Sequence, residues 1–405
     1  IGGPGFWTLF GIPLRKSLFF ICFLTLILLT LTRVISLKKN DYIYICSLLL
    51  FLTIWVLIIP ILKHGSLSFS LADGLPLIYL AFTLLLTNFY KNNYQAWQIQ
   101  RVIFFSLFLM IAFTSILIWI IGTTNPFLDV PIKFAVHSYF SLGLGEKVPS
   151  IYVGLMSDGF FRVLWITHIA FLPMLFISLH YKKNIFALVF LIAIFTSYTR
   201  AFWLTSALLL IILFLMDIFL KKNILGKRVI AFSCLASILL ISFYSEFLLA
   251  LSQRLFALLN DESGSVRLSQ LFALIDGWQK SPLLGNGFGS YVDFTRSSSI
   301  PFSYELTYVS LLMKLGLIGF FILFLLFIYH INFVGKPSNK RICIIFGILS
   351  ILGVSFTNPY LINFVGLGFI SLLIVEYNFV QNTSCNHADI SLLNKNENTT
   401  KSKVN

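Results

Sequence analysis

Long apolar runs separated by short polar connections fill most of this chain, and they restrict its fold more than any other feature. A helix needs about 20 apolar residues to cross a lipid bilayer, and about eleven runs approach or reach that length. Only 11% of the residues are charged, against about 25% in a soluble domain. We therefore predict an all-α bundle of membrane-spanning helices at roughly residues 17–36, 42–62, 74–90, 102–122, 163–180, 184–199, 201–219, 228–245, 307–331, 342–357 and 361–379.

The basic residues predict the orientation of these helices. By the positive-inside rule, connections rich in Lys and Arg are cytoplasmic. The loops 123–162 and 246–306 then lie on the extracytoplasmic side, together with the turn that carries Arg200. The same alternation places Ile1 outside, so we expect one further span before it and about twelve in all. The basic connections are residues 33–39, 91–101, 182–183, 221–228 and 336–341.

The predicted spans divide the chain into four parts. These are an N-terminal bundle (1–245), an extracytoplasmic loop (246–306), C-terminal helices (307–379) and a polar, disordered cytoplasmic tail (380–405). The loop carries charged side chains and the turn-forming sequence SPLLGNGFG. In a membrane protein, a long polar loop is where recognition or catalysis usually occurs. We therefore expect the catalytic residues in this loop.

Several kinds of chemistry are not indicated by the sequence. It has no GxxxxGK[ST], HExxH or GxSxG motif and no Cys/His cluster, so we predict neither a nucleotide cofactor nor a metal. The net charge is +14, but the basic residues form no patch with interleaved aromatic side chains, so nucleic acid is not an expected partner. His168, inside the fifth predicted span, is more typical of a packed histidine than of a catalyst.

Three arginines on the extracytoplasmic side are candidate anion ligands, because a guanidinium stays charged and its planar fork matches phosphate oxygens. Arg200 stands between two apolar runs and would otherwise be an interfacial anchor. Arg267 lies in a stretch with apolar residues at helical spacing, which predicts an amphipathic helix on the outer surface. A solvated face is the alternative for Arg267. For Arg162, at the mouth of the fifth span, a purely topological role is favoured.

A turn and a carboxylate complete the candidate set. Gly287 is one of three glycines in SPLLGNGFG, where glycines allow positive φ and close backbone approach; a simple tight turn is the alternative. Glu305 comes two residues before the ninth span. Apolar surroundings should raise the pKa of this carboxyl, which suits a general base, although an ordinary interfacial acid would look the same. Tyr308 follows three residues later.

Together these motifs resemble the O-antigen ligase/O-antigen polymerase superfamily. The resemblance rests on an Arg after a short span, a long loop with SxR…W…SPLLGxGxG, and ExxY leading into a Gly-x-x-Gly span at Gly316 and Gly319. It covers about residues 196–320. It implies a bundle of about twelve spans in the bacterial inner membrane, with one large periplasmic loop. It also implies transfer of a glycan from undecaprenyl diphosphate to an acceptor hydroxyl, without nucleotide or metal.

The resemblance also implies roles for the candidate residues. Arg200 and Arg267 would hold the diphosphate and Glu305 would be the acid/base residue, with Arg162, Gly287 and Tyr308 as further substrate-binding candidates. Ligases that load the lipopolysaccharide core typically carry His where this chain has Glu305. That difference favours a polymerase, whose acceptor is another lipid-linked repeat unit and whose partner is a protein that sets chain length.

Two alternatives stay open at this point. A ligase would use lipid A–core as the acceptor. A secondary transporter would also be a bundle of many spans, but it should carry charges buried within spans, or paired broken helices. The middle parts of the predicted spans are nearly free of charge, so we favour a glycosyltransferase.

Overall fold

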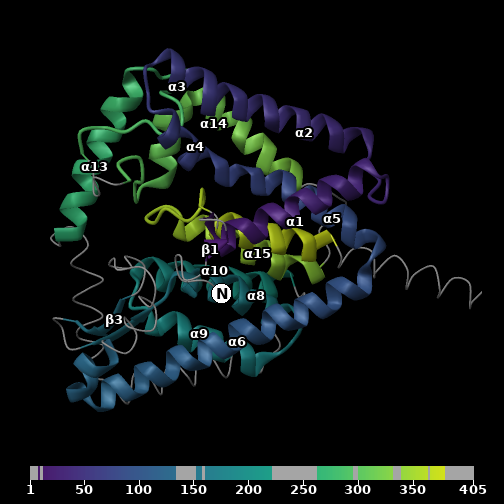
Figure 1. The fold of residues 1–405 in the computed structure, drawn as a ribbon. Helices are drawn as coiled ribbons and strands as arrows, with labels where there is room; N and C mark the ends of the chain where they lie inside the picture. The colour runs from purple at the N-terminus through teal and green to yellow at the C-terminus, as the bar shows by residue number, and fades with distance from the viewer. Residues whose placement is uncertain are drawn as a thin grey trace, which may run out of the picture.

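Helices make up most of the protein in the computed structural model, which describes residues 8–9, 12–133, 152–156, 160–220, 262–294, 300–331, 339–363 and 365–378 (Figure 1). Within these residues, five helices are long and apolar enough to cross a membrane: Lys39–Leu62, Leu67–Lys91, Tyr94–Thr124, Arg200–Phe219 and Thr307–Tyr329. Shorter apolar helices accompany them. The chain is therefore a helical membrane protein, as predicted. The eighth predicted span (228–245) and the tail (380–405) lie outside the described residues.

The first long helical path contains an irregular turn that matters for the site. After α1 (Leu14–Leu31), α2 (Lys39–Leu52) continues through a π-helical turn, η1 (Thr53–Ile58), into α3 (Ile59–Leu62). The Trp55 carbonyl in this turn accepts a hydrogen bond from the Phe288 N–H at 2.9 Å. The Val56 carbonyl accepts one from the Ser70 hydroxyl at 2.6 Å. The irregular turn thus joins this path to two other parts of the chain.

The next two paths are longer than predicted. α4 (Leu67–Gly74), the short 3₁₀ segment η2 (Leu75–Leu77) and α5 (Ile78–Asn92) follow one another, so the helix begins seven residues before position 74. α6 (Tyr94–Thr124) has 31 residues, which corresponds to about 46 Å at 1.5 Å per residue. It runs from the β3 side of the molecule to the opposite side in Figure 1.

Two small antiparallel sheets correct the all-α prediction. One pairs β1 (Thr8–Leu9) with β2 (Ile12–Pro13), and the other pairs β3 (Tyr152–Leu155) with β4 (Phe161–Leu164). A short 3₁₀ helix, η3 (Pro126–Leu128), comes between α6 and β3.

The β4 strand changes the start of the fifth predicted span. That span does not begin at 163, because buried side chains alternate along β4 as they do in a strand. The helix starts only at η4 (Ile166–Ala170), where the Trp165 N–H donates to Nδ1 of the buried His168 at 2.8 Å. His168 is therefore a packed histidine, but the expectation of a fully hydrogen-bonded one is not met, because its buried Nε2 has no partner among the described residues.

The centre of the bundle is α8 (Phe171–His180), in which every residue from Phe171 to Leu179 is buried. It packs against α9 (Asn184–Thr196) and α15 (Asn339–Val354). α10 (Arg200–Leu220) contacts α15, and an apolar helix over Val365–Asn378 closes the described part.

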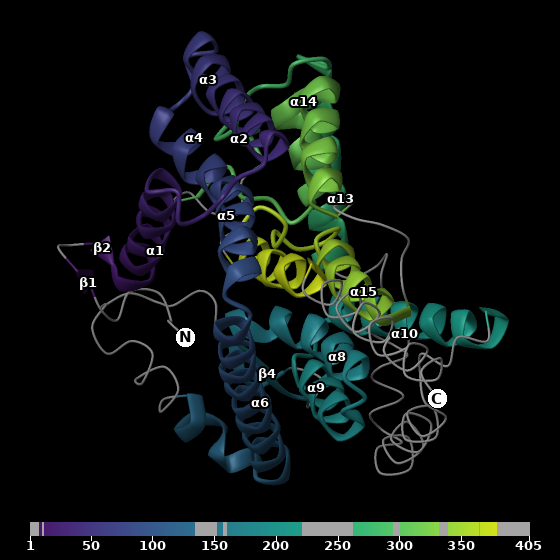
Figure 2. The same ribbon diagram turned by 90° about the vertical axis from the view of Figure 1, so that its right-hand side faces the viewer.

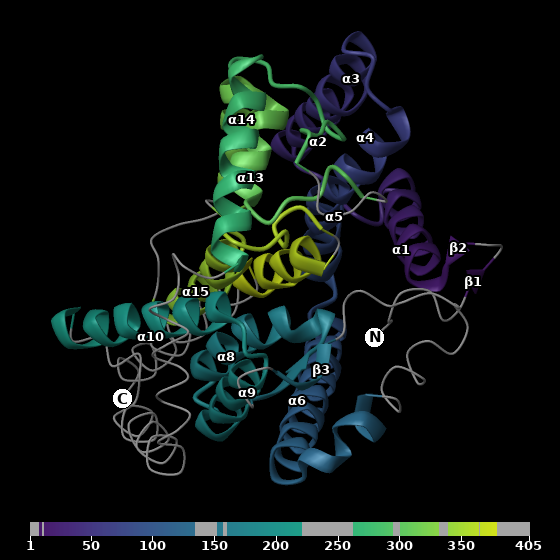
Figure 3. The same ribbon diagram turned by 90° about the vertical axis from the view of Figure 1, so that its left-hand side faces the viewer.

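The last pair of helices carries the candidate catalytic segment. α13 (Glu262–Gln279) packs along α14 (Thr307–Ile331), and Figures 2 and 3 show the two side by side. α14 is not the continuous span that the sequence predicts, since it breaks at Gly316, where φ is 63° and ψ is −175°.

The connections sort into two ends of the bundle. Asn88 donates to Asp41, which follows the basic connection 33–39, and accepts from Lys91 of the next basic connection. Arg101 donates to Tyr181, beside the connection 182–183. These three basic connections therefore share one end, as the alternation of charge predicts. Three turns lie at the other end. The turn 197–199 contacts Arg162, the turn 285–286 contacts Lys63, and the turn 355–358 contacts Thr307.

Candidate active site

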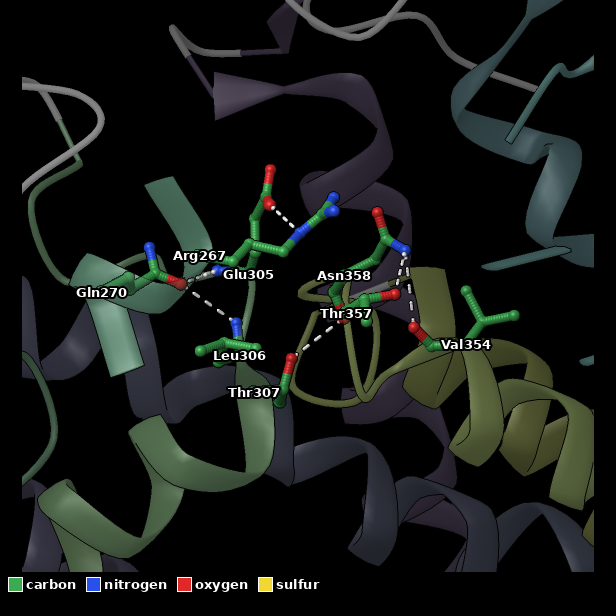
Figure 4. Close-up of polar contacts among 8 residues, drawn as sticks. All are labelled: Arg267, Gln270, Glu305, Leu306, Thr307, Val354, Thr357 and Asn358. Carbon is green, nitrogen blue, oxygen red and sulfur yellow. Dashed lines mark hydrogen bonds and ion pairs between the residues drawn. The ribbon is translucent and has the colours of Figure 1, made fainter. Parts of the chain in front are cut away.

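Arg267 and Glu305 form an ion pair at the start of α14. The Nε of Arg267 donates to Oε2 of Glu305 at 2.8 Å, and Figure 4 shows the two side chains pointing toward one another. The exposed fraction is 32% for the Arg267 side chain and 17% for that of Glu305. The pair is therefore accessible to a substrate and still partly withdrawn from water. The sequence predicted these two residues as partners of one substrate, and the structure brings them together.

Gln270 holds the backbone on which Glu305 sits. It lies one helical turn beyond Arg267 on α13, and its Oε1 accepts the N–H groups of Glu305 at 3.1 Å and Leu306 at 3.2 Å (Figure 4). Both residues lie directly before α14, where their N–H groups have no helical carbonyl to bond. One amide side chain therefore fixes the point where the chain enters α14.

Thr307 ties this point to the turn after α15. Its hydroxyl donates to the Asn358 carbonyl at 2.9 Å, and Asn358 in turn contacts Thr357 and Val354 (Figure 4). The start of α14 is thus held from two sides, by α13 and by residues 354–358. Such support restricts the position of the Glu305 side chain, which is what a catalytic group requires.

The ion pair decides which charged form Glu305 takes. Apolar surroundings favour a protonated carboxyl, whereas a guanidinium in hydrogen-bond contact favours the carboxylate. The hydrogen bond from Arg267 favours the carboxylate, and only this form can accept a proton. The desolvation argument made from the sequence did not include this neighbour.

Arg162 lies in β4, not at the mouth of a helix. Its Nε donates to the Ser197 carbonyl at 3.0 Å and one terminal nitrogen donates to the Thr199 hydroxyl at 3.3 Å. The guanidinium also lies over the Tyr152 ring, 5.1 Å from its centroid. Arg162 thus supports the turn that directly precedes Arg200, the half-buried first residue of α10.

Tyr360 connects the two groups of residues. Burial raises the pKa of Tyr360 to about 12, and the nearby Arg162 guanidinium acts in the opposite direction. Its ring contacts that of Phe202 on α10, with centroids 5.9 Å apart. Asn358, two residues before Tyr360, bonds Thr307. The turn 355–363 therefore lies between the turn 197–199, which Arg162 contacts, and the start of α14. Convergence of Arg200 itself on the Arg267–Glu305 pair stays a prediction.

The SPLLGNGFG turn is inserted into the break of α14. Beyond the break, the N–H groups of Leu317 and Ile318 donate to the carbonyls of Pro282 at 2.9 Å and Leu283 at 3.0 Å. Before it, the carbonyls of Met313 and Lys314 accept from Asn286 at 3.1 Å and Gly287 at 2.8 Å. Backbone groups that the broken helix would leave unbonded are thus bonded by the turn.

Gly287 is buried at this junction, with a φ of 83°. A Cβ on it would come within 2.7 Å of the Pro60 side chain on α3. The structure therefore gives Gly287 a packing role, and contact with a substrate stays a prediction.

Tyr308 points into the bundle. Its hydroxyl donates to the Leu352 carbonyl at 2.7 Å, and its ring packs on Phe356, with centroids 4.4 Å apart. These contacts fix α14 against α15. The predicted role of Tyr308 in substrate binding is not tested by them.

Sequence reasoning missed three residues of this region. Gln270 gave no signal, because a glutamine on an amphipathic helix is ordinary. Lys314 lies inside a predicted span and Asp73 one residue before another, but the mid-span regions were treated as nearly free of charge. The structure shows Lys314 buried and Asp73 mostly buried, with Nζ of Lys314 2.6 Å from Oδ2 of Asp73.

Comparison with known families agrees with this geometry. Residues 185–324 match the family model described as O-antigen ligase, a range that includes Arg200, Arg267 and Glu305. Neither a curated protein nor a solved structure gives a match. The domain supports a function of the O-antigen ligase or polymerase type, with lipid-linked glycans as the class of substrate. The match over residues 185–324 supports membership of the O-antigen ligase/polymerase superfamily.

Proposed function

We propose that this protein is a polymerase of O-antigen or a related surface polysaccharide in the bacterial inner membrane. It transfers a glycan from undecaprenyl diphosphate to a hydroxyl of another lipid-linked repeat unit on the periplasmic side. The observation that carries the proposal is the Arg267–Glu305 pair, a cation and a carboxylate held together at the beginning of a membrane helix within the matched domain.

The two side chains fit the two halves of such a transfer. The Glu305 carboxylate takes the proton of the acceptor hydroxyl while the oxygen of that hydroxyl bonds to the anomeric carbon of the donor glycan. The bond between that carbon and the diphosphate oxygen breaks, and the electron pair leaves with the diphosphate. Arg267, together with Arg200, stabilises the charge that develops on this leaving group.

The ion pair also suggests an order of events. Without substrate, Arg267 bonds the Glu305 carboxylate. A bound diphosphate competes for the same guanidinium, and its two phosphates carry more negative charge than one carboxylate. Arg267 would then turn toward the donor, and Glu305 would become free to bind the acceptor hydroxyl. Donor binding thereby prepares the base.

A ligase is the second candidate, since the matched family is described as O-antigen ligase. Only the acceptor differs, lipid A–core in place of a lipid-linked repeat unit. We favour the polymerase because this chain carries Glu305 where core-loading ligases typically carry His.

The break in α14 and the buried Asp73–Lys314 pair are features expected of a transporter. In this protein, however, the turn 282–287 bonds the backbone on both sides of the break. Those groups are therefore not presented to a solute, and we retain the transferase.

Deletion of the gene and analysis of the surface glycan tests the proposal. Loss of polymer with a single repeat unit still attached to the core indicates a polymerase, and loss of all attached glycan indicates a ligase. Unchanged glycan excludes both and leaves the transporter.

Site variants then test the residues. Arg200→Ala, Arg267→Ala and Glu305→Gln should each abolish long chains at unchanged protein levels. Asp276→Asn is the matched control, because it removes an exposed carboxylate from the same helix as Arg267. Normal glycan ladders from all three site variants would contradict the site assignment.

A further inference from the structure

The buried ion pair between Asp73 on α4 and Lys314 on α14 has no evident value for stability. Its side chains are only 11% and 5% exposed. Withdrawing two charges from water costs several kcal/mol per ion, and apolar replacements of such pairs are often equally stable. Ionisable groups inside membrane helices usually serve a function.

Both partners also form a hydrogen bond with the backbone beyond the turn. Oδ2 of Asp73 accepts the backbone N–H of Gly289 at 2.9 Å. Nζ of Lys314 donates to the carbonyl of Phe302 at 2.8 Å. The ion pair therefore bonds the backbone at Gly289, at the end of the turn, and again at Phe302, three residues before Glu305.

Aromatic side chains strengthen the attachment close to Glu305. The ammonium of Lys314 lies 5.8 Å from the ring centroid of Phe302 and 5.9 Å from that of Tyr304, within the range of a cation–π contact. Tyr304 is buried, and its hydroxyl accepts the N–H of Val292 at 2.7 Å. Burial raises the pKa of Tyr304 to about 12, so its hydroxyl stays protonated at neutral pH.

From these contacts we infer that Asp73 and Lys314 are positioning residues for Glu305. Gln270 holds the Glu305 backbone from α13, and Lys314 holds the chain three residues earlier from α14. The partners of the ion pair on this segment are backbone groups and aromatic rings, none of which titrates near neutral pH. The pair therefore acts through geometry. The inference extends the proposed function, since it depends on Glu305 as the acid/base residue.

The test uses the full-length protein in detergent with the double variant Asp73→Asn/Lys314→Met. This variant removes both charges together, so neither is left buried alone. The charge-reversed variant Asp73→Lys/Lys314→Asp restores an ion pair but cannot accept from Gly289 or donate to Phe302. Lys63→Met is the control, because Lys63 bonds Gly285 and Asn286 of the same turn and none of the described residues within 289–306.

Two measurements separate the anchor from the proposed reaction. Hydrogen exchange of the peptide 300–306 reports the anchor directly, without any substrate. Transfer kinetics use the lipid-diphosphate glycan that accumulates in the deletion strain. We expect both double variants to lose protection in 300–306. Their kcat should fall by up to about a hundredfold, the scale of a misplacement near 1 Å, with KM for the donor nearly unchanged.

Unchanged exchange in 300–306 would overturn the inference, whatever the activity. A second result would also overturn the inference: both double variants lose protection in 300–306 but keep the wild-type kcat, while Glu305→Gln is inactive. Normal transfer by Glu305→Gln would instead refute the proposed role of Glu305, and with it the positioning role, even where exchange shows that the pair anchors the segment.

Discussion

Replacing Gly316 by alanine tests the junction that holds the candidate site. At φ 63° and ψ −175°, Gly316 has a backbone conformation that is essentially reserved for glycine. A Cβ there would lie 2.3 Å from the Leu283 carbonyl oxygen and 2.5 Å from the Gly285 nitrogen. Both atoms belong to the backbone of the inserted turn, so a rotamer change cannot relieve the clash, and the turn itself must move.

The cost follows from two contributions. Strain at such a position is about 1–3 kcal/mol. Movement of the turn breaks the hydrogen bonds from Leu317 to Pro282 and from Ile318 to Leu283, and each contributes about 0.5–1.5 kcal/mol net. We therefore expect Gly316→Ala to destabilise the protein by about 2–6 kcal/mol.

Thermal unfolding of the purified protein in detergent measures this effect. Gly368→Ala is the control, because Gly368 lies within the helix Val365–Asn378 and its added Cβ would meet only Tyr79, at an ordinary 3.7 Å. That variant should be neutral or slightly more stable, since alanine exceeds glycine in helix propensity by up to about 1 kcal/mol. Equal unfolding temperatures for Gly316→Ala and Gly368→Ala would refute the inserted turn.

Two further variants separate the site from the rest of the bundle. Gln270→Ala deprives the N–H groups of Glu305 and Leu306 of their acceptor. We expect about 1–3 kcal/mol lower stability and about tenfold to a hundredfold slower transfer. Wild-type transfer rates would contradict the role of Gln270. Glu376→Gln breaks a buried cluster in which Glu376 bonds Arg101, Trp97 and Tyr181. This cluster lies at the opposite end of α6 from β4, the strand that carries Arg162. The substitution should cost about 3 kcal/mol in unfolding assays and lower the protein level, while transfer per folded molecule stays at the wild-type rate.

Much of the helical framework could be predicted from the sequence, because an apolar run in lipid has few solutions other than a helix. Apart from 228–245, which is not described, each predicted span coincides with a helix, although boundaries shift by several residues. The failures have local causes. β4 is a four-residue strand inside an apolar run, too short for its alternation to stand out. The break at Gly316 was hidden because glycine is common in membrane helices.

The candidate site was predictable in part. The resemblance selected Arg267 and Glu305, which form an ion pair. It could not select Asp73 and Lys314, which are 241 positions apart in the chain and follow no local pattern. Their pairing depends on how α4 and α14 meet through the turn 282–289, and that contact is a property of the tertiary fold. Gln270 was missed for the same reason, since its partners lie at the start of another helix.

One physical requirement explains why the irregularities of this fold occur together. A polar turn that enters an apolar bundle must find partners for its backbone, since no water is there to supply them. Here the π-helical turn η1 offers the Trp55 carbonyl to Phe288, and the broken α14 offers groups on both sides of Gly316. The indole N–H of Trp55 also donates to Leu284 and Leu315, at 2.9 and 3.0 Å. Two imperfect helices thus provide the hydrogen bonds that one glycine-rich turn needs. Directional contacts at Gly289 and Phe302 hold the chain beyond this turn, and the Glu305 carboxylate follows three residues after the second contact.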